Sequence, residues 1–152
     1  MTAAVTAGAG FLLAVLWFDL MFDVQARRSS GDDRALPEAA LASIAGYYAR
    51  VTTAARPMNR LIALVMAATL VAAGVQLVRE DVPVWVSVAS IALLAGAVTV
   101  AAVATVPKAV RLGTRADPIG VQSRLAGSIL RDHLICFGAI AALIVIQLGF
   151  AI

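Results

Sequence analysis

Two carboxylates at the end of the first apolar stretch, Asp19 and Asp23, are the residues best placed to do chemistry. They are four residues apart, so in a helix they lie on one face, one turn from each other. They follow a run of uncharged side chains from residue 1 to residue 18. A charge beside such a run requires a partner, water or a proton. The pair could therefore bind a proton, a cation or a small polar ligand.

Other polar residues are predicted to lie at the same end of the molecule. With the two acids they form one set of candidate ligand- or ion-binding residues: Asp19, Asp23, Arg56, Asn59, Arg60, Arg131, Asp132 and His133. Two hypotheses follow. In the first, ion pairs of the two acids with Arg56 and Arg60 fix how the helices align. In the second, the set lines a polar cavity that faces the cytoplasm and binds an ion, a proton or a small ligand.

Common catalytic and metal-binding patterns do not occur in the sequence. The chain has one histidine, and it contains neither His-x-x-x-His nor Glu-x-x-His, which are typical spacings of helical metal sites. It also contains no Gly-x-Ser-x-Gly nucleophile motif, no phosphate-binding loop and no dinucleotide fingerprint. We therefore predict no metal and no cofactor, and the sequence favours a protein that is not an enzyme.

The composition is that of a membrane protein. Hydrophobic residues make up 62% of the 152 residues and charged residues 14%, whereas soluble domains are about one quarter charged. The mean hydropathy is +0.94. The net charge of +3 does not indicate nucleic-acid binding, because the basic residues lie between apolar segments, as membrane topology requires. The predicted partner is the lipid bilayer.

Four apolar segments are long enough to cross that bilayer. They run from about 3 to 22, 57 to 78, 82 to 106 and 133 to 152, and about 20 helical residues span the hydrocarbon core. The segments are continuously apolar and do not alternate, which favours helices over a β-barrel. We predict an all-α, four-helix membrane bundle, with residues 1–152 as one domain and loops at 24–56 and 107–132.

The charges predict how this bundle is oriented. Eleven of the twelve Lys and Arg residues lie in or beside the two long loops, and the remaining one, Arg79, lies in the short link. By the positive-inside rule both long loops are cytoplasmic and both termini are outside. Arginine greatly outnumbers lysine, and alanine and valine are abundant, from which we predict a bacterial cytoplasmic (inner) membrane protein.

Each long loop is predicted to contain an amphipathic helix at the inner interface, or a downward extension of the next span. Apolar residues recur at three- to four-residue spacing after Pro37 and again after Pro118. The two loops also match at an offset of 81 residues, with six identities between Arg34 and Arg50. This match predicts an internal repeat of two tandem helical hairpins. The alternative explanation of the match is that two membrane-surface helices each require a proline at the start and a cationic residue at the end.

Three classes of function fit these features. The first is a small membrane protein that binds or transports a small solute or ion, or an accessory subunit of a larger membrane complex. Small residues four apart, such as Ala4 and Gly8, would also suit a homo-oligomer. The second is a membrane oxidoreductase or oxygenase that acts on a lipid-soluble, quinone-like substrate, with Asp23, Arg60 and His133 handling protons. The third is a structural scaffold.

Overall fold

The computed structural model describes residues 1–29, 35–54 and 56–150, without the side chains of Arg28, Ser29 and Arg56. Within these ranges the regular structure is helical and contains no strand. The longer helices are α1 (Thr2–Asp23), α2 (Glu38–Ala49), α3 (Arg56–Arg79), α4 (Val84–Val100), α5 (Val106–Gly113) and α6 (Ile119–Phe150). The all-α prediction is therefore confirmed.

Four helical segments are long and apolar enough to cross a membrane. They are Thr2–Arg27, Pro57–Arg79, Val84–Gly113 and Ile119–Phe150. Each contains most of one predicted span, but the third and fourth extend further into the second long loop. At about 1.5 Å per residue, the 32 residues of α6 exceed a hydrocarbon core of about 30 Å. Part of α6 therefore projects from the bilayer. This agrees with the alternative in which the helix of the second loop extends the fourth span.

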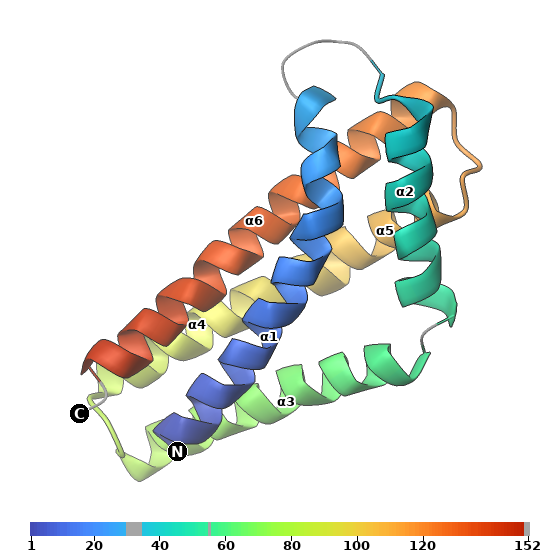
Figure 1. The fold of residues 1–152 in the computed structure, drawn as a ribbon. Helices are drawn as coiled ribbons and strands as arrows, with labels where there is room; N and C mark the ends of the chain where they lie inside the picture. Colours follow the sequence, from blue (N-terminus) through green and yellow to red (C-terminus); the bar gives the residue numbers. More distant parts are fainter. Residues whose placement is uncertain (30–34, 55, 151–152) are drawn as a thin grey trace.

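The helices form a bundle with a smaller helical layer at one end (Figure 1). α6 packs against α1 and α4, α3 packs against α1 and α4, and α2 packs against α5 and α6. The N-terminus, the α3–α4 turn and the end of α6 lie at the same end of the bundle. There the Met1 ammonium group pairs with Asp81 at 3.2 Å. We call this the terminal end and the opposite one the loop end.

Proline residues set where several helices begin or change shape. α2 and α6 start directly after Pro37 and Pro118, as the sequence predicts. Pro107 lies inside the third membrane segment, where its missing N–H group cannot complete the ordinary ladder. The preceding turn (η3, Ala101–Thr105) widens into a π-helix, which is a common way to accommodate such a defect. The helix then continues as α5, which carries Lys108 to the loop end.

α1 and α3 approach each other closely at Gly8. A Cβ atom added at Gly8 would lie 2.1 Å from the Thr69 hydroxyl oxygen, so a larger residue there would require the Thr69 side chain to shift. In the N-terminal half of α3, residues 57–68 include no fully buried side chain. Figure 1 shows the same divergence, since the start of α3 lies away from α1 and α4. Residues 57–68 therefore contact the core through partly buried side chains, among them Ile62, Val65 and Met66.

Candidate functional site

Asp19, Asp23 and His133 lie in a polar layer between two apolar cores. On the loop-end side, Leu20 of α1 and Ile129 of α6 belong to a core shared with α2 and α5. On the terminal side, Leu12 and Cys136 belong to a core shared by α1, α3, α4 and α6. Asp19 and His133 fall between these positions on the same two helices, and Asp23 lies one turn after Asp19, between Leu20 and Ala26 of the loop-end core. Packing of α1 against α6 thus positions the polar layer.

His133 is held by the buried carboxylate of Asp23. Its Nδ1 atom lies 2.6 Å from Asp23 Oδ2, which is a short, charge-assisted distance. The Tyr48 hydroxyl donates to Asp23 Oδ1, also at 2.6 Å. Both carboxylate oxygens of Asp23 therefore have partners, and its side chain is 0% exposed. If Asp23 is ionised, its oxygen accepts a hydrogen bond from His133, so the proton of a neutral imidazole ring lies on Nδ1. The Nε2 atom of that ring then has a free lone pair.

Asp19 forms the accessible side of the cluster. The Tyr47 hydroxyl donates to Asp19 Oδ1 at 2.6 Å, and the Tyr47 ring stacks on Phe22 with centroids 4.1 Å apart. Asp19 Oδ2 lies 3.8 Å from His133 Nε2, which is too long for a hydrogen bond. The side chains of Asp19 and His133 are 16% and 9% exposed. This pair of acceptor atoms is thus the part of the cluster that another group can reach.

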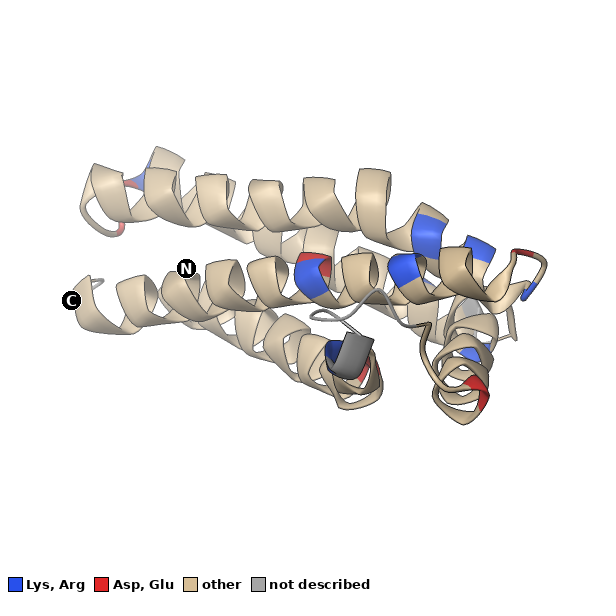
Figure 2. Ribbon diagram, turned by 90° about the horizontal axis from the view of Figure 1, so that it is seen from above, with Lys and Arg blue, Asp and Glu red and all other residues tan. Residues whose placement is uncertain are grey.

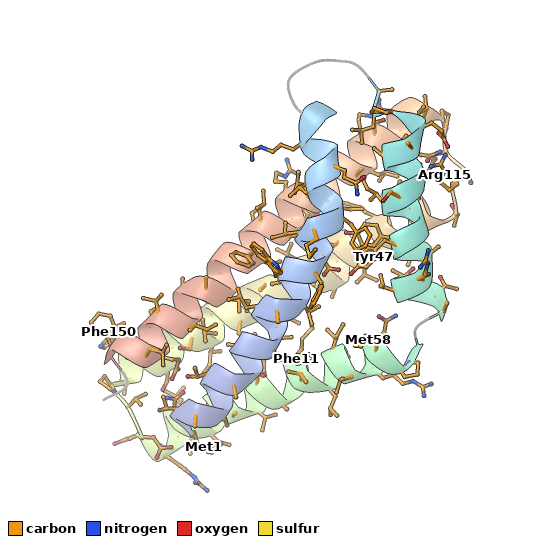
Figure 3. The ribbon with its side chains drawn as sticks, viewed as in Figure 1. Met1, Phe11, Tyr47, Met58, Arg115 and Phe150 are labelled. Atoms are coloured by element: carbon orange, nitrogen blue, oxygen red, sulfur yellow. The ribbon has the colours of Figure 1, made fainter. Side chains whose placement is uncertain are left out.

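Burial and the adjacent carboxylates keep both tyrosines in the protonated form. Burial raises the pKa of Tyr47 above its ordinary value of 10.0, and the charge of Asp19 raises it further. The pKa of Tyr48 is raised by burial and then by the charge of Asp23. Both hydroxyl groups therefore remain hydrogen-bond donors to the carboxylates at neutral pH. Figure 3 shows Tyr47 between α1 and α2, where it makes this contact.

Asp132, which directly precedes His133 in the chain, pairs with a residue outside the Asp19–Asp23–His133 cluster. Lys108 Nζ lies 2.5 Å from Asp132 Oδ2 and 2.8 Å from the Ser128 hydroxyl oxygen. Lys108 comes from α5, so this ion pair joins the third and fourth membrane segments. The charges of Lys108 and Asp132 cancel each other, so Lys108 does not neutralise Asp19 or Asp23.

Among the predicted residues whose side chains the structure describes, only the two acids and His133 are brought together. Arg60 and Arg131 are exposed and Asn59 is half-buried, while the side chain of Arg56 is outside the described part. The predicted ion pair with Arg60 is wrong, because the acids contact His133 and the tyrosines instead. The physical reason is the divergence of α3, which carries Arg60 away from α1.

Sequence reasoning missed three members of the site, Tyr47, Tyr48 and Lys108. Tyr48 is one of the apolar residues that recur at three- to four-residue spacing after Pro37, and its ring does lie in the apolar core. The available signal was that the chain has two tyrosines, adjacent in a helix predicted to lie at the inner interface or to extend the next span. A buried tyrosine hydroxyl usually has a hydrogen-bond partner, and an unpaired carboxylate is a strong acceptor.

A second buried polar layer lies at the terminal end. The side-chain amides of Gln76 and Gln147 bond to each other through two contacts of 3.1 Å. Gln147 also donates to the Ser90 hydroxyl at 2.9 Å, and Gln76 to the Thr2 hydroxyl at 3.3 Å. These four residues come from α1, α3, α4 and α6. The layer carries no charge, and it is separated from the acids by the terminal-side apolar core.

The fold and these two layers define a multi-pass helical membrane protein. Charged residues gather at the loop end, apart from a small group at the α3–α4 turn (Figure 2). Within the described part of the chain, no group of three or more His, Cys, Asp or Glu side chains is arranged to hold a metal ion. Comparisons with family models, curated proteins and solved structures find no match to this chain.

Proposed function

We propose that this chain is a bacterial cytoplasmic-membrane protein that binds a proton or a small cation at Asp19, Asp23 and His133, as the binding step of solute or ion transport. The observation that supports this proposal is the position of the His133 ring between two carboxylates. Ionisable groups within a membrane bundle usually mark ion or proton pathways. The cluster has one sealed acid and one accessible acid, which suits reversible binding from one side.

The three groups would act as one titrating unit. Asp23 orients the ring and holds the proton on Nδ1, while Nε2 and Asp19 Oδ2 remain as acceptors on the accessible side. Groups this close exchange protons as a coupled set, so a change at one alters the titration of the others. A proton or cation bound at Nε2 of His133 and Oδ2 of Asp19 would offset the negative charge of the carboxylates, which is unfavourable in apolar surroundings.

We further propose that the loop end faces the cytoplasm and that both termini are outside. The support is the distribution of cations, since eleven of twelve lie in or beside the two long loops. In this orientation the accessible edge of the site is reached from the inner leaflet or the cytoplasm. The terminal-side apolar core then separates the site from the outer face.

Proton counting tests the proposed function. Purified protein in weakly buffered lipid discs is acidified from about pH 8 to about pH 5, the range in which histidine usually titrates. We expect His133→Gln and Asp19→Asn each to change the number of protons taken up, with effects that are not additive. Arg131→Gln is the matched control, because Arg131 is exposed. Uptake that is unchanged in both site variants would identify the cluster as a structural lock.

A second candidate function is redox chemistry on a quinone-like substrate. The hydroxyl, carboxylate and imidazole groups of Tyr47, Asp19 and His133 lie close together and favour it, because such groups can donate protons to a carbonyl oxygen. This candidate predicts that a quinone or a chromophore is extracted with the protein from native membranes. A colourless preparation without a co-extracted quinone would count heavily against this candidate.

A further inference from the structure

One exposed face of α6 carries two arginines. Arg124 and Arg131 are seven residues apart, which is close to two helical turns, so they lie on the same face of the helix. Both side chains are exposed, and neither forms an ion pair with the described residues. Figure 2 shows cations on the loop-end half of α6, the helix that leads to the C-terminus. Within the described part of the chain the charges of this face are therefore not compensated.

The acidic residues nearest to these arginines in the sequence have other partners. Asp132, which follows Arg131, pairs with Lys108 of α5. Asp117, which lies shortly before α6, pairs with Arg111 at 2.8 Å. Neither carboxylate is thus available to the two arginines of α6. A surface with uncompensated positive charge attracts anions.

The length of α6 places Arg131 at the boundary of the hydrocarbon core. Nineteen residues separate it from Phe150, the last residue of α6, and at about 1.5 Å per residue they span about 29 Å. The hydrocarbon core of a bilayer is about 30 Å thick. Arg131 therefore lies where acyl chains meet phosphate groups, and Arg124 lies about 10 Å further towards the loop end. The long side chain of an arginine can extend to the headgroups from either position.

Beyond Arg131 the same face of α6 is apolar and exposed. Gly138 and Val145 follow Arg131 at the same seven-residue interval, and both are exposed. Leu134 and Ile135, about one turn after Arg131, are 53% and 55% exposed. This part of α6 contacts the bilayer directly. A lipid can therefore place its headgroup at the arginines while its acyl chains stay in the bilayer, and no cavity in the protein is required.

Gly127 leaves open space between the two arginines. It is three residues after Arg124 and four before Arg131, so all three lie on adjoining turns of one face. A Cβ atom added at Gly127 would meet no atom within 4 Å. Guanidinium groups form paired, charge-assisted hydrogen bonds with phosphate oxygens. The two arginines thus flank a space that a phosphate group can enter.

We propose that Arg124 and Arg131 bind the phosphate group of an anionic phospholipid in the leaflet at the loop end, with its acyl chains along the exposed apolar part of α6. A zwitterionic phospholipid carries a cation next to its phosphate, so two uncompensated arginines favour an anionic headgroup. The surface is separate from the Asp19–Asp23–His133 cluster, which is enclosed by α1, α2 and α6. The proposal does not depend on the proposed function.

Native mass spectrometry of the detergent-purified protein tests this proposal with added phosphatidylglycerol or phosphatidylcholine. We expect phosphatidylglycerol to bind more tightly. Arg124→Gln and Arg131→Gln should each weaken its binding about tenfold or more, because the loss of charge-assisted hydrogen bonds corresponds to about that factor. Arg60→Gln is the matched control, since Arg60 is exposed and lies nineteen residues before the end of α3. Equal binding by all three variants, or of the two lipids, would overturn the proposal.

A pair of substitutions at Gly127 tests the position of the phosphate group. Gly127→Glu places a carboxylate four residues before Arg131, where it can pair with the guanidinium group, and Gly127→Gln adds a side chain of the same size without the charge. We expect Gly127→Glu to bind phosphatidylglycerol at least about tenfold more weakly than Gly127→Gln. Circular dichroism checks that both variants keep their helices. Equal binding by the two variants would show that the phosphate group does not lie between the arginines.

Inorganic phosphate separates a lipid site from a site for free phosphate. We expect sodium phosphate not to displace phosphatidylglycerol when both are present at the same concentration, because a free phosphate lacks the acyl chains. Displacement would show that the surface binds phosphate without a lipid, which would contradict the proposal. Proton counting in discs of neutral lipid, which contain no anionic headgroup, tests the acid cluster separately. The two proposals can therefore fail independently.

Discussion

Asp19 and Asp23 differ in their environment although they are one helical turn apart. Asp23 is sealed between His133 and Tyr48, and Asp19 keeps one oxygen near the surface. Removing one partner from a buried charged pair leaves the other without compensation. The two acids should therefore contribute unequally to stability and to binding.

Alanine substitution tests this inequality. We expect Asp23→Ala to lower the free energy of unfolding by about 3 kcal/mol, because it strands His133 and Tyr48. Asp19→Ala should cost about 1 kcal/mol, since its side chain is partly exposed and loses only the hydrogen bond from Tyr47. Unfolding of the purified protein in mixed micelles with increasing denaturing detergent measures both values. A larger loss for Asp19→Ala than for Asp23→Ala would contradict the geometry described above.

The two tyrosines make a second prediction, on pH dependence. Their pKa values are raised in the folded protein, so the folded state retains protons that the unfolded state loses above about pH 10. The resulting stability is fully present below pH 10 and is lost as the pH rises further. Since the chain has only these two tyrosines, phenolate absorbance reports on them alone. It should appear together with unfolding, and phenolate formed in the folded protein would contradict this prediction.

Single residues could be predicted from the sequence to different extents. The two acids are evident because a carboxylate next to an uncharged run is rare and costly. The role of His133 was open, since a histidine at the start of a span resembles an ordinary interfacial residue. Tyr48 was missed because its ring fits the apolar pattern after Pro37, and that pattern says nothing about where a hydroxyl group points.

At the scale of helices, close contact between α1 and α3 depends on Gly8. We expect Gly8→Ala to destabilise the protein by about 1–3 kcal/mol, because the added methyl group overlaps the Thr69 hydroxyl. Gly10→Ala is the matched control, since a Cβ atom there meets nothing within 4 Å. Combining Gly8→Ala with Thr69→Ala should restore most of the loss. Equal effects of the two single glycine variants in the unfolding assay would contradict the close approach.

The glutamine layer at the terminal end joins four helices. We expect Gln147→Leu to cost about 1 kcal/mol, which is typical of hydrogen bonds between membrane helices, because Gln76 and Ser90 lose their partner. In a double-mutant cycle with Gln76→Leu, the combined loss should be smaller than the sum of the single losses. Strict additivity would indicate that the two amides do not interact.

Helix positions were largely predictable, whereas helix directions were not. Length and hydropathy locate the four spans, and Pro37 and Pro118 mark the starts of α2 and α6. The divergence of α3 has no such signal, because it follows from packing among all the helices. The internal repeat stays a prediction, although the offset of 81 residues does relate the first residues of α2 and α6, Glu38 and Ile119.

For the whole molecule, the distribution of charge predicts its orientation in the membrane. In a background with Cys136 replaced by serine, single cysteines are placed at Asp81 in the α3–α4 turn and at Ala116 in the α5–α6 connection; both positions are exposed. In intact cells a membrane-impermeant maleimide should label the first and not the second. The reverse pattern would place the long cationic loops outside and contradict the proposed orientation.

The central claim is that His133 presents Nε2 to the accessible side while Asp23 holds its Nδ1 proton. Because the chain has one histidine, nitrogen NMR of histidine-labelled protein in lipid discs observes this ring alone. We predict that the neutral ring carries its proton on Nδ1, and that acidification and Asp19→Asn both change the Nε2 signal. A neutral ring protonated on Nε2, or an Nε2 signal that responds to neither change, would contradict the account.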